Sequence, residues 1–193
     1  VRNTFRRKSR LALTFAALLL AGSMFISIIG IREEMRQASI EMQKEANYDL
    51  DVDLARPYSQ SELEETALRV KGVREVETWA VDTGRLVFSK DHLSGSIILY
   101  GIPQSTTMTQ PAVINGTWLS KPKSIFVNND FLLLSPDLKV GSVITLNIGG
   151  KEEEWTIVGS TGRGFIPIAY VYYDDLTNVT GLDGFASRLV VRT

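Results

Sequence analysis

The sequence predicts an α+β protein in which a long N-terminal transmembrane helix and stalk carry a domain of mixed helices and strands. Three observations predict this class. An uncharged run near the N-terminus is long enough to cross a bilayer, a helical pattern continues beyond it, and short strands with glycine turns fill most of the remaining chain. Roughly 160 residues follow the uncharged run, which is enough for one substantial domain or two small subdomains.

The predicted membrane span is Leu11–Ile31, which contains 21 residues and no charged side chain. At about 1.5 Å per residue, a helix of this length crosses the hydrocarbon core of a bilayer. Five basic residues precede the run, and all 22 acidic residues follow it. Because lysine and arginine beside a span mark its cytoplasmic end, we expect a cytoplasmic N-terminus and an extracytoplasmic domain. The five are Arg2, Arg6, Arg7, Lys8 and Arg10.

Two other interpretations of this segment are less well supported. A cleaved signal peptide has a shorter apolar region, and cleavage at Ala21-Gly22-Ser23 would leave an exposed apolar N-terminus. The basic cluster lies directly beside the span, so contact with anionic lipid head groups explains it more simply than nucleic-acid binding does. We therefore expect membrane lipids as partners of the cluster and no nucleic acid.

The helical pattern continues beyond the span. Apolar residues recur at steps of three and four among charged residues, which is typical of a helix that packs on a partner helix. No proline interrupts Leu11–Ala46, so one continuous helix of 36 residues is predicted. A solvated single helix is the alternative for so charged a stretch. The predicted packing seam of this stalk consists of Ile31, Met35, Ala38, Met42 and Ala46.

A strand–helix–strand unit is predicted next. Apolar and acidic residues alternate over Tyr48–Leu54, which predicts a strand that Pro57 ends. Ser61 and Glu64 have the spacing of a capping box at the start of a helix. A second strand is expected over Val73–Val81.

The later chain is predicted to be mostly β. A Gly149-Gly150 pair between two apolar runs, Val143–Ile148 and Glu154–Val158, predicts a β-hairpin with a primed turn. Further short strands are expected at 85–88, 96–102, 125–127, 168–173 and 188–192, with a short helix at 131–134.

The sequence contains no group of residues with the spacing of a catalytic, metal or cofactor site. With one histidine, His92, and no cysteine, spacing supports neither a zinc site nor a nucleophile–base pair. Consecutive carboxylates at 152–154 and 174–175 point to alternating faces of a strand, so they do not converge on one metal. The glycine-containing segment 160–164 lacks the Gly-Lys-Ser/Thr ending of a phosphate-binding loop. We therefore expect no enzyme activity and no cofactor.

Aromatic residues offer the only candidate for ligand binding in the sequence. Alternation along a strand puts Tyr170 and Tyr172 on one face and Tyr173 on the other. Packing in the core or between subdomains is the favoured role of these rings, and lining a pocket for an apolar ligand is the alternative. The same two roles are open to Trp118 and Trp155.

The order of several short motifs resembles a known family. A basic segment, residues 2–14, leads into the span, and three motifs follow: Gly116-Thr117-Trp118-Leu119, the stretch from Leu138 to Leu146, and Trp155-Thr156-Ile157-Val158-Gly159. Together they resemble the FtsX-like, MacB-type permeases of bacterial ABC transporters, over nearly the whole chain.

The resemblance implies a non-catalytic membrane subunit in a bacterial inner membrane, part of a multi-pass protein. It implies a separate ABC ATPase subunit, a second permease subunit or permease half, and an extracytoplasmic adaptor or substrate as partners. The helix would transmit the effect of ATP hydrolysis to the extracytoplasmic domain for export or mechanotransmission. Two other classes remain open at this point: a single-span anchored receptor or binding module, and a membrane-anchored enzyme.

The resemblance also implies a division of the chain. Residues 1–46 would form the cytoplasmic tip, span and stalk, and 47–95 the first part of a porter-like α/β subdomain. A mostly β subdomain at 96–180 would interrupt it, and 181–193 would begin its return. The rest of the porter-like subdomain and a returning membrane helix are then expected beyond this sequence, which begins with Val1 rather than methionine.

Overall fold

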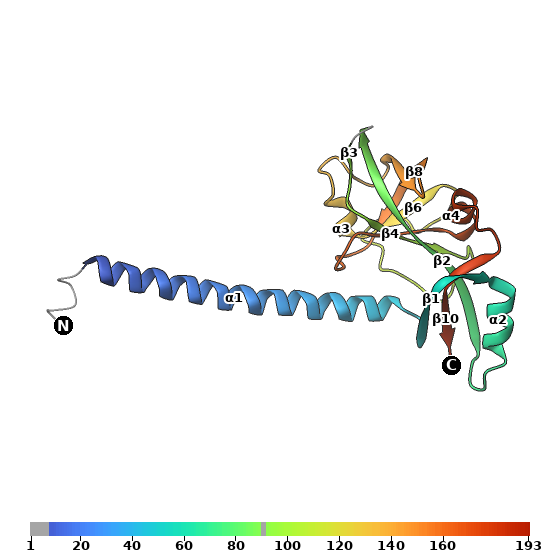
Figure 1. Ribbon diagram of the computed structural model, residues 1–193, viewed down its shortest axis with the longest axis horizontal. Helices are drawn as coiled ribbons and strands as arrows, with labels where there is room; N and C mark the ends of the chain where they lie inside the picture. The colour runs from blue at the N-terminus through green and yellow to red at the C-terminus, as the bar shows by residue number, and fades with distance from the viewer. Residues whose placement is uncertain (1–7, 90–91) are drawn as a thin grey trace. The chain divides into compact units, whose positions relative to one another are not determined.

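The structure is a computed structural model that describes residues 8–89 and 92–193, without the side chains of residues 8, 9, 38 and 41–43. The chain divides into two compact units, Val1–Ile40 and Glu41–Thr193. Figure 1 gives the order of the elements. Each unit is described by itself below.

The first unit consists of most of helix α1, which runs over Lys8–Glu45 for 38 residues. Its segment Arg10–Gln37 has the length and apolar composition of a membrane span, and none of it is buried within the chain. Arg36 and Glu33, one turn apart, form an ion pair of 2.6 Å on its surface. The predicted uninterrupted helix is confirmed, and it ends one residue before the expected Ala46.

The second unit begins with a small antiparallel sheet covered by one helix. Strand β1 (Leu50–Ser59) pairs with β10 (Phe185–Arg192), which pairs with the first part of β2 (Glu75–Ser89). Helix α2 (Gln60–Leu68) connects β1 to β2 and lies beside this sheet (Figure 1). The predicted strand–helix–strand unit is therefore present.

The expectation that Pro57 ends the first strand is wrong. Strand β1 continues through Pro57 to Ser59. It lies at the edge of the sheet, and its pairing with β10 is irregular between Asp53 and Tyr58. A proline is tolerated there because no ladder hydrogen bond requires its missing N–H.

The predicted capping box does not form either. Helix α2 begins one residue before Ser61, and the side chain of its N-cap residue, Ser59, caps no backbone N–H. Glu64 instead accepts a 2.8 Å hydrogen bond from the Thr78 hydroxyl on β2. The Glu64 carboxylate therefore bonds to a residue on another element, and it does not accept the backbone N–H that a capping box requires.

The later strands form a closed barrel. Strand β2 pairs with β4, β4 with β9, β9 with β6, β6 with β8, β8 with β7, and β7 with β2 again, so six strands complete a ring. The strands not bounded above are β4 (Ile97–Ile102), β6 (Ser124–Val127), β7 (Val143–Ile148), β8 (Lys151–Ser160) and β9 (Ile168–Tyr172). Short strands β3 (His92–Leu93) and β5 (Asn115–Gly116) pair with β2 and β8.

Strand β2 belongs to both the small sheet and the barrel. The sequence predicts separate strands at 73–81 and 85–88, but the structure has one strand of 15 residues. Its start pairs with β10, its middle with β4 and its later part with β7. Figure 1 shows it as the long green arrow that joins the two parts.

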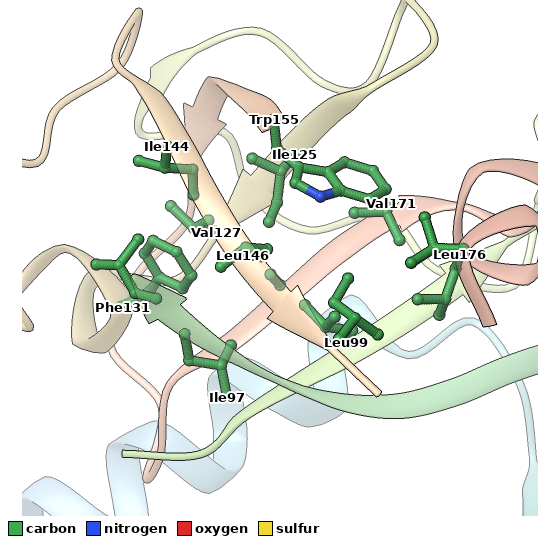
Figure 2. Close-up of a cluster of buried hydrophobic side chains, with 14 of the residues drawn as sticks. Ile97, Leu99, Ile125, Val127, Phe131, Ile144, Leu146, Trp155, Val171 and Leu176 are labelled. Atoms are coloured by element: carbon green, nitrogen blue, oxygen red, sulfur yellow. The ribbon is translucent and has the colours of Figure 1, made fainter. Parts of the chain in front are cut away.

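Apolar side chains fill the barrel interior. Ile97, Leu99, Leu146 and Trp155 point toward one another in Figure 2, and each is at most 1% exposed. Two helices complete this core: α3 (Asn129–Leu132), two residues earlier than predicted, and α4 (Tyr173–Thr180). Helix α4 is absent from the sequence prediction, and its Asp174 and Asp175 lie in the first turn of a helix rather than at the end of a strand.

The predicted β-hairpin is confirmed. Strands β7 and β8 are joined by Gly149 and Gly150, with φ angles of 58° and 87°. Positive φ at both central residues is what a type I′ turn requires, and glycine adopts it without steric cost.

Candidate binding site

The structure describes only part of the predicted basic cluster. Arg2, Arg6 and Arg7 lie outside the described residues, and Lys8 begins α1 with a side chain that is not described. Arg10 is exposed on the first turns of α1. The role of the cluster in membrane topology therefore stays a prediction.

The predicted stalk seam also stays a prediction. Ile31 and Met35 are exposed by 61% and 53%, so they are free to meet a partner helix. The side chains of Ala38 and Met42 lie outside the described set. Ala46 has a different role, because it follows the helix and forms an isolated β-bridge with Thr109.

The charged residues considered for catalysis do not gather into one site. His92 is exposed on β3, with its ring 5.0 Å from that of Phe88. Glu152 and Glu154 are exposed, whereas Glu153 pairs with Lys123 at 3.1 Å. Among the described residues, no three histidine, cysteine or acidic side chains are placed to hold a metal ion.

Both expected roles of the aromatic residues occur: some rings pack in the core, and others lie beside a pocket. Trp155 is 1% exposed inside the barrel, and Tyr173 donates a 2.7 Å hydrogen bond to the carbonyl of Phe185. These two rings therefore pack in the core. Tyr170 lies on the outer side of the barrel in a second buried cluster, where Trp118 packs 5.6 Å from it.

This second cluster borders a pocket of about 200 Å³. Rings of Tyr48, Trp79, Tyr100 and Tyr170 line it, and neighbouring rings meet at centroid distances of 5.6 to 6.2 Å. Two of these contacts, Tyr48–Trp79 and Trp79–Tyr100, are edge-to-face, which is a favoured geometry for aromatic pairs. The small sheet and the barrel both contribute, since Trp79 is on β2 and Tyr170 is on β9.

Arg188 on β10 supplies a positive charge to the pocket wall. Its guanidinium lies 5.2 Å from the centre of the Tyr100 ring, forms an ion pair with Asp51, and lies 3.5 Å from Asp53. Burial lowers the pKa of Arg188, while the neighbouring Tyr48 hydroxyl raises it. The Nε of Arg188 is buried and forms no hydrogen bond with another described residue.

The opposite wall is a loop, Gly162–Ile166, held by two side chains. Asn128 donates to the carbonyl of Ile166 at 2.7 Å and accepts from the N–H of Ile168 at 3.1 Å. Asp130 accepts from the N–H of Gly164 at 2.6 Å. The glycine-containing segment 160–164 of the sequence thus forms part of this wall.

Glu45, the last residue of α1, forms hydrogen bonds with residues beside the pocket. Its carboxylate accepts from the Thr161 hydroxyl at 2.8 Å, and its carbonyl accepts from the N–H of Gln110 at 3.0 Å. The N–H of Asn47 donates to the carbonyl of Met108 at 2.9 Å. Residues 45–47 are therefore held against the segment 108–110 like a short strand pair.

The two residues before that segment are in turn bonded to β2. The hydroxyl of Thr106 and the N–H of Thr107 donate to Glu77 at 2.6 and 2.8 Å. Arg192 on β10 donates to the carbonyl of Asn47 at 2.6 and 3.0 Å. The residues that follow α1 are therefore bonded directly to β10, and they are connected to β2 through the segment 106–110.

Most of these residues are not recognisable as a site from the sequence. Tyr48, Trp79 and Tyr100 lie far apart in the sequence, and only the fold brings their rings together. One signal was present: Arg188 interrupts an apolar stretch, and Asp51 and Asp53 have the spacing of one strand face. An arginine opposite two carboxylates on neighbouring strands predicts an ion pair.

Solved structures with a similar fold include two extracytoplasmic domains. The extracellular domain of the noncanonic ABC-type transporter YknZ from Gram-positive bacteria matches with a TM-score of 0.54 and 15% identity, over 74% of this chain and 81% of that chain. The periplasmic region of MacB from Actinobacillus actinomycetemcomitans matches with a TM-score of 0.52 and 14% identity, over 72% and 66%. The chain has their fold.

This finding confirms the predicted fold class and, at the level of fold, the resemblance to MacB-type permeases. No family model matches the sequence, and no curated protein matches it.

Proposed function

We propose that this chain is part of the membrane permease subunit of a bacterial ABC transporter. The observation that carries the proposal is the continuity of an apolar 28-residue helical segment with a domain that has the fold of the YknZ and MacB extracytoplasmic domains. In this proposal the chain is not catalytic. A separate ATPase subunit hydrolyses ATP, and a second permease subunit or half completes the membrane part.

The proposed orientation places the N-terminus in the cytoplasm and the globular unit outside the membrane. The five basic residues before the span support it, because such residues mark cytoplasmic ends. The chain contains no cysteine, so single introduced cysteines can be labelled without background. In spheroplasts, a membrane-impermeant maleimide should label Asn178→Cys, on an exposed position of α4, and should label Asn3→Cys only after lysis. The reverse pattern would refute the orientation.

The proposed mechanism is mechanical coupling through α1. A continuous helix transmits displacement along its axis, and hydrogen bonds of residues 45–47 hold its end to the globular unit. Cargo could be exported, or the movement itself could be the output.

A helix-breaking insertion tests the coupling. Gly-Pro inserted after Arg36 should abolish the ATP-dependent activity of the assembled transporter while membrane insertion is retained, because proline removes a helical hydrogen bond and glycine adds freedom. Ala-Ala inserted at the same place is the matched control, since it shifts the helix equally but leaves it continuous. Full activity of the Gly-Pro variant would refute the mechanism, and equal loss in both variants would assign the effect to helix phase instead.

One observation favours the second candidate, a single-span anchored receptor: the aromatic pocket of the globular unit. Copurification with an ABC ATPase subunit separates the two. A permease should form a stable complex with the ATPase encoded in the same genome, and an anchored receptor should not.

A further inference from the structure

We infer that the aromatic pocket of the globular unit binds an organic cation with a methylated nitrogen, such as a quaternary ammonium group. Three observations carry the inference: aromatic rings line the pocket, a carboxylate on its wall has no basic partner among the described side chains, and the polar side chains of the wall are already hydrogen-bonded. It goes beyond the proposed function, because such binding is expected whether or not the chain takes part in transport.

Four aromatic rings line the pocket, those of Tyr48, Trp79, Tyr100 and Tyr170. Neighbouring ring planes are inclined by 31° to 89°, so the rings form walls of different direction, as in a cage. The face of an aromatic ring attracts a cation that lies within about 6 Å of its centre. Arg188 makes one such contact, at 5.2 Å from the centre of the Tyr100 ring. Tyr48 and Tyr100 are only half-buried, so part of each remains accessible to a ligand.

Glu45 places a negative charge on the pocket wall. Its carboxylate accepts from the Thr161 hydroxyl at 2.8 Å and from the N–H of Ala112 at 3.3 Å. Both donors are neutral, and Glu45 forms no ion pair with a side chain that the structure describes. Because Glu45 lines the pocket and is only half-buried, its charge is available to a bound cation.

The positive charge of Arg188 does not exclude a cation. Asp51 forms an ion pair with its guanidinium, and Asp53 lies 3.5 Å from it, so two carboxylates face one basic group. Arg163, the other basic residue on the wall, is exposed, so water and salt screen its charge. With Glu45 included, carboxylates on or beside the wall outnumber guanidinium groups. The pocket therefore attracts a cation and repels an anion.

Size and hydrogen bonding favour a methylated nitrogen over a primary ammonium. The pocket has a volume of about 200 Å³. An apolar cavity of about 150 Å³ binds benzene, and a trimethylammonium group is close to benzene in size. A primary ammonium has three N–H donors to satisfy, but Asn128 already bonds to the backbone of Ile166 and Ile168, and Thr161 to Glu45. Methyl groups need no acceptor and pack against the rings.

Three matched probes test the ligand class: choline, its uncharged isostere 3,3-dimethylbutan-1-ol, and ethanolamine, whose ammonium group carries no methyl group. The full chain, with ¹⁵N-labelled tryptophan indoles, is placed in nanodiscs of an uncharged galactolipid and titrated with each at constant ionic strength. Trp79 lines the pocket and Trp155 lies inside the barrel. Choline should shift the Trp79 signal, leave that of Trp155 unchanged, and bind about tenfold more tightly than either other probe.

Two pairs of variants test the pocket itself. Glu45→Gln removes the charge on the wall, so choline should bind about tenfold less tightly while the uncharged isostere binds as before. Glu62→Gln, which removes an exposed charge on α2, should change neither affinity. Tyr48→Leu replaces a ring by an apolar side chain without a π face and should weaken choline binding about fivefold, whereas Tyr58→Leu, at an exposed ring, should not.

A quaternary ammonium group can come from a soluble cation or from a lipid head group, and nanodiscs of phosphatidylcholine separate the two sources. A Trp79 signal that is already at its choline-bound position without added ligand supports the inference with a lipid as the source. A signal that moves only when free choline is added supports it with a soluble cation as the source.

The inference is overturned if choline does not move the Trp79 signal in either kind of nanodisc, or if the uncharged isostere or ethanolamine binds at least as tightly as choline. It is also overturned if Glu45→Gln binds choline as tightly as Glu62→Gln does. An unchanged Trp155 signal in each variant shows that the barrel has kept its fold.

Discussion

Tyr170 is a phenol held in a nearly closed environment on the outer side of the barrel. It is 8% exposed, and burial raises its pKa above the ordinary value, with a further upward contribution from the charge of Glu45. Because ionisation would place an uncompensated charge among aromatic rings, the folded protein keeps this proton well into alkaline pH.

This retention predicts an alkaline loss of stability. Above a pH of about 10 the unfolded chain releases the Tyr170 proton while the folded chain keeps it, so the free energy of unfolding falls as pH rises. The contribution approaches about 1.4 kcal/mol per pH unit. Tyr170→Phe should remove it, as measured by urea unfolding between pH 9 and 11.5 (roughly the window set by the tyrosine pKa). Tyr58→Phe, at an exposed ring, should leave the slope unchanged, and equal slopes in all three proteins would contradict the prediction.

At the scale of elements, helix α4 closes the barrel core by close approach to β4. A Cβ added at Gly101 on β4 would lie 3.0 Å from Cδ2 of Leu176 on α4 and 3.2 Å from Cβ of Ala80 on β2. Leu176 is completely buried between these elements. The absence of a side chain at position 101 thus allows the helix to dock.

A double-mutant cycle tests this docking. Leu176→Ala should cost about 2–5 kcal/mol of unfolding free energy because it leaves a cavity, and Gly101→Ala should cost about 1–3 kcal/mol because it crowds the contact. The double variant should be more stable than the sum predicts, since the shortened side chain relieves the added methyl group. Leu133→Ala, at a position 65% exposed, is the control and should change stability little. Strict additivity would contradict a direct contact.

Local patterns predict some of these elements well and others poorly. The Gly149-Gly150 hairpin and the uninterrupted α1 were predictable because their signals lie within a few neighbouring residues. Helix α4 was not, because Tyr173–Thr180 directly follows a strand whose aromatic alternation extends into it. The pocket was least predictable: Tyr48, Tyr100 and Arg188 come from three strands or their ends, and tertiary pairing alone brings them together.

At the scale of the whole globular unit, the barrel is a closed ring of strands, whereas the small sheet has an edge strand. The barrel ring has no free edge, because β7 pairs with both β2 and β8. Strand β1 lies at the edge of the small sheet and pairs on one side only, with β10. The apolar Leu50 and Val52 of β1 are exposed by 53% and 38%, in contrast to the buried residues of β7.

Hydrogen exchange, measured on the full chain in nanodiscs, should therefore be slower in the barrel strands than in the edge strand β1. Backbone amides of β4 and β7 should exchange at least about tenfold more slowly than those of β1, because opening the ring requires the loss of interior packing whereas an edge strand frays locally. Exchange of β1 as slow as that of β7 would contradict this hierarchy.

The single strand β2 has one more consequence. Since it runs without interruption from the small sheet into the barrel, the two parts have no flexible linker along this connection. The small sheet and the barrel cannot turn against each other unless β2 bends or the ladder hydrogen bonds that it makes with β10, β4 and β7 break.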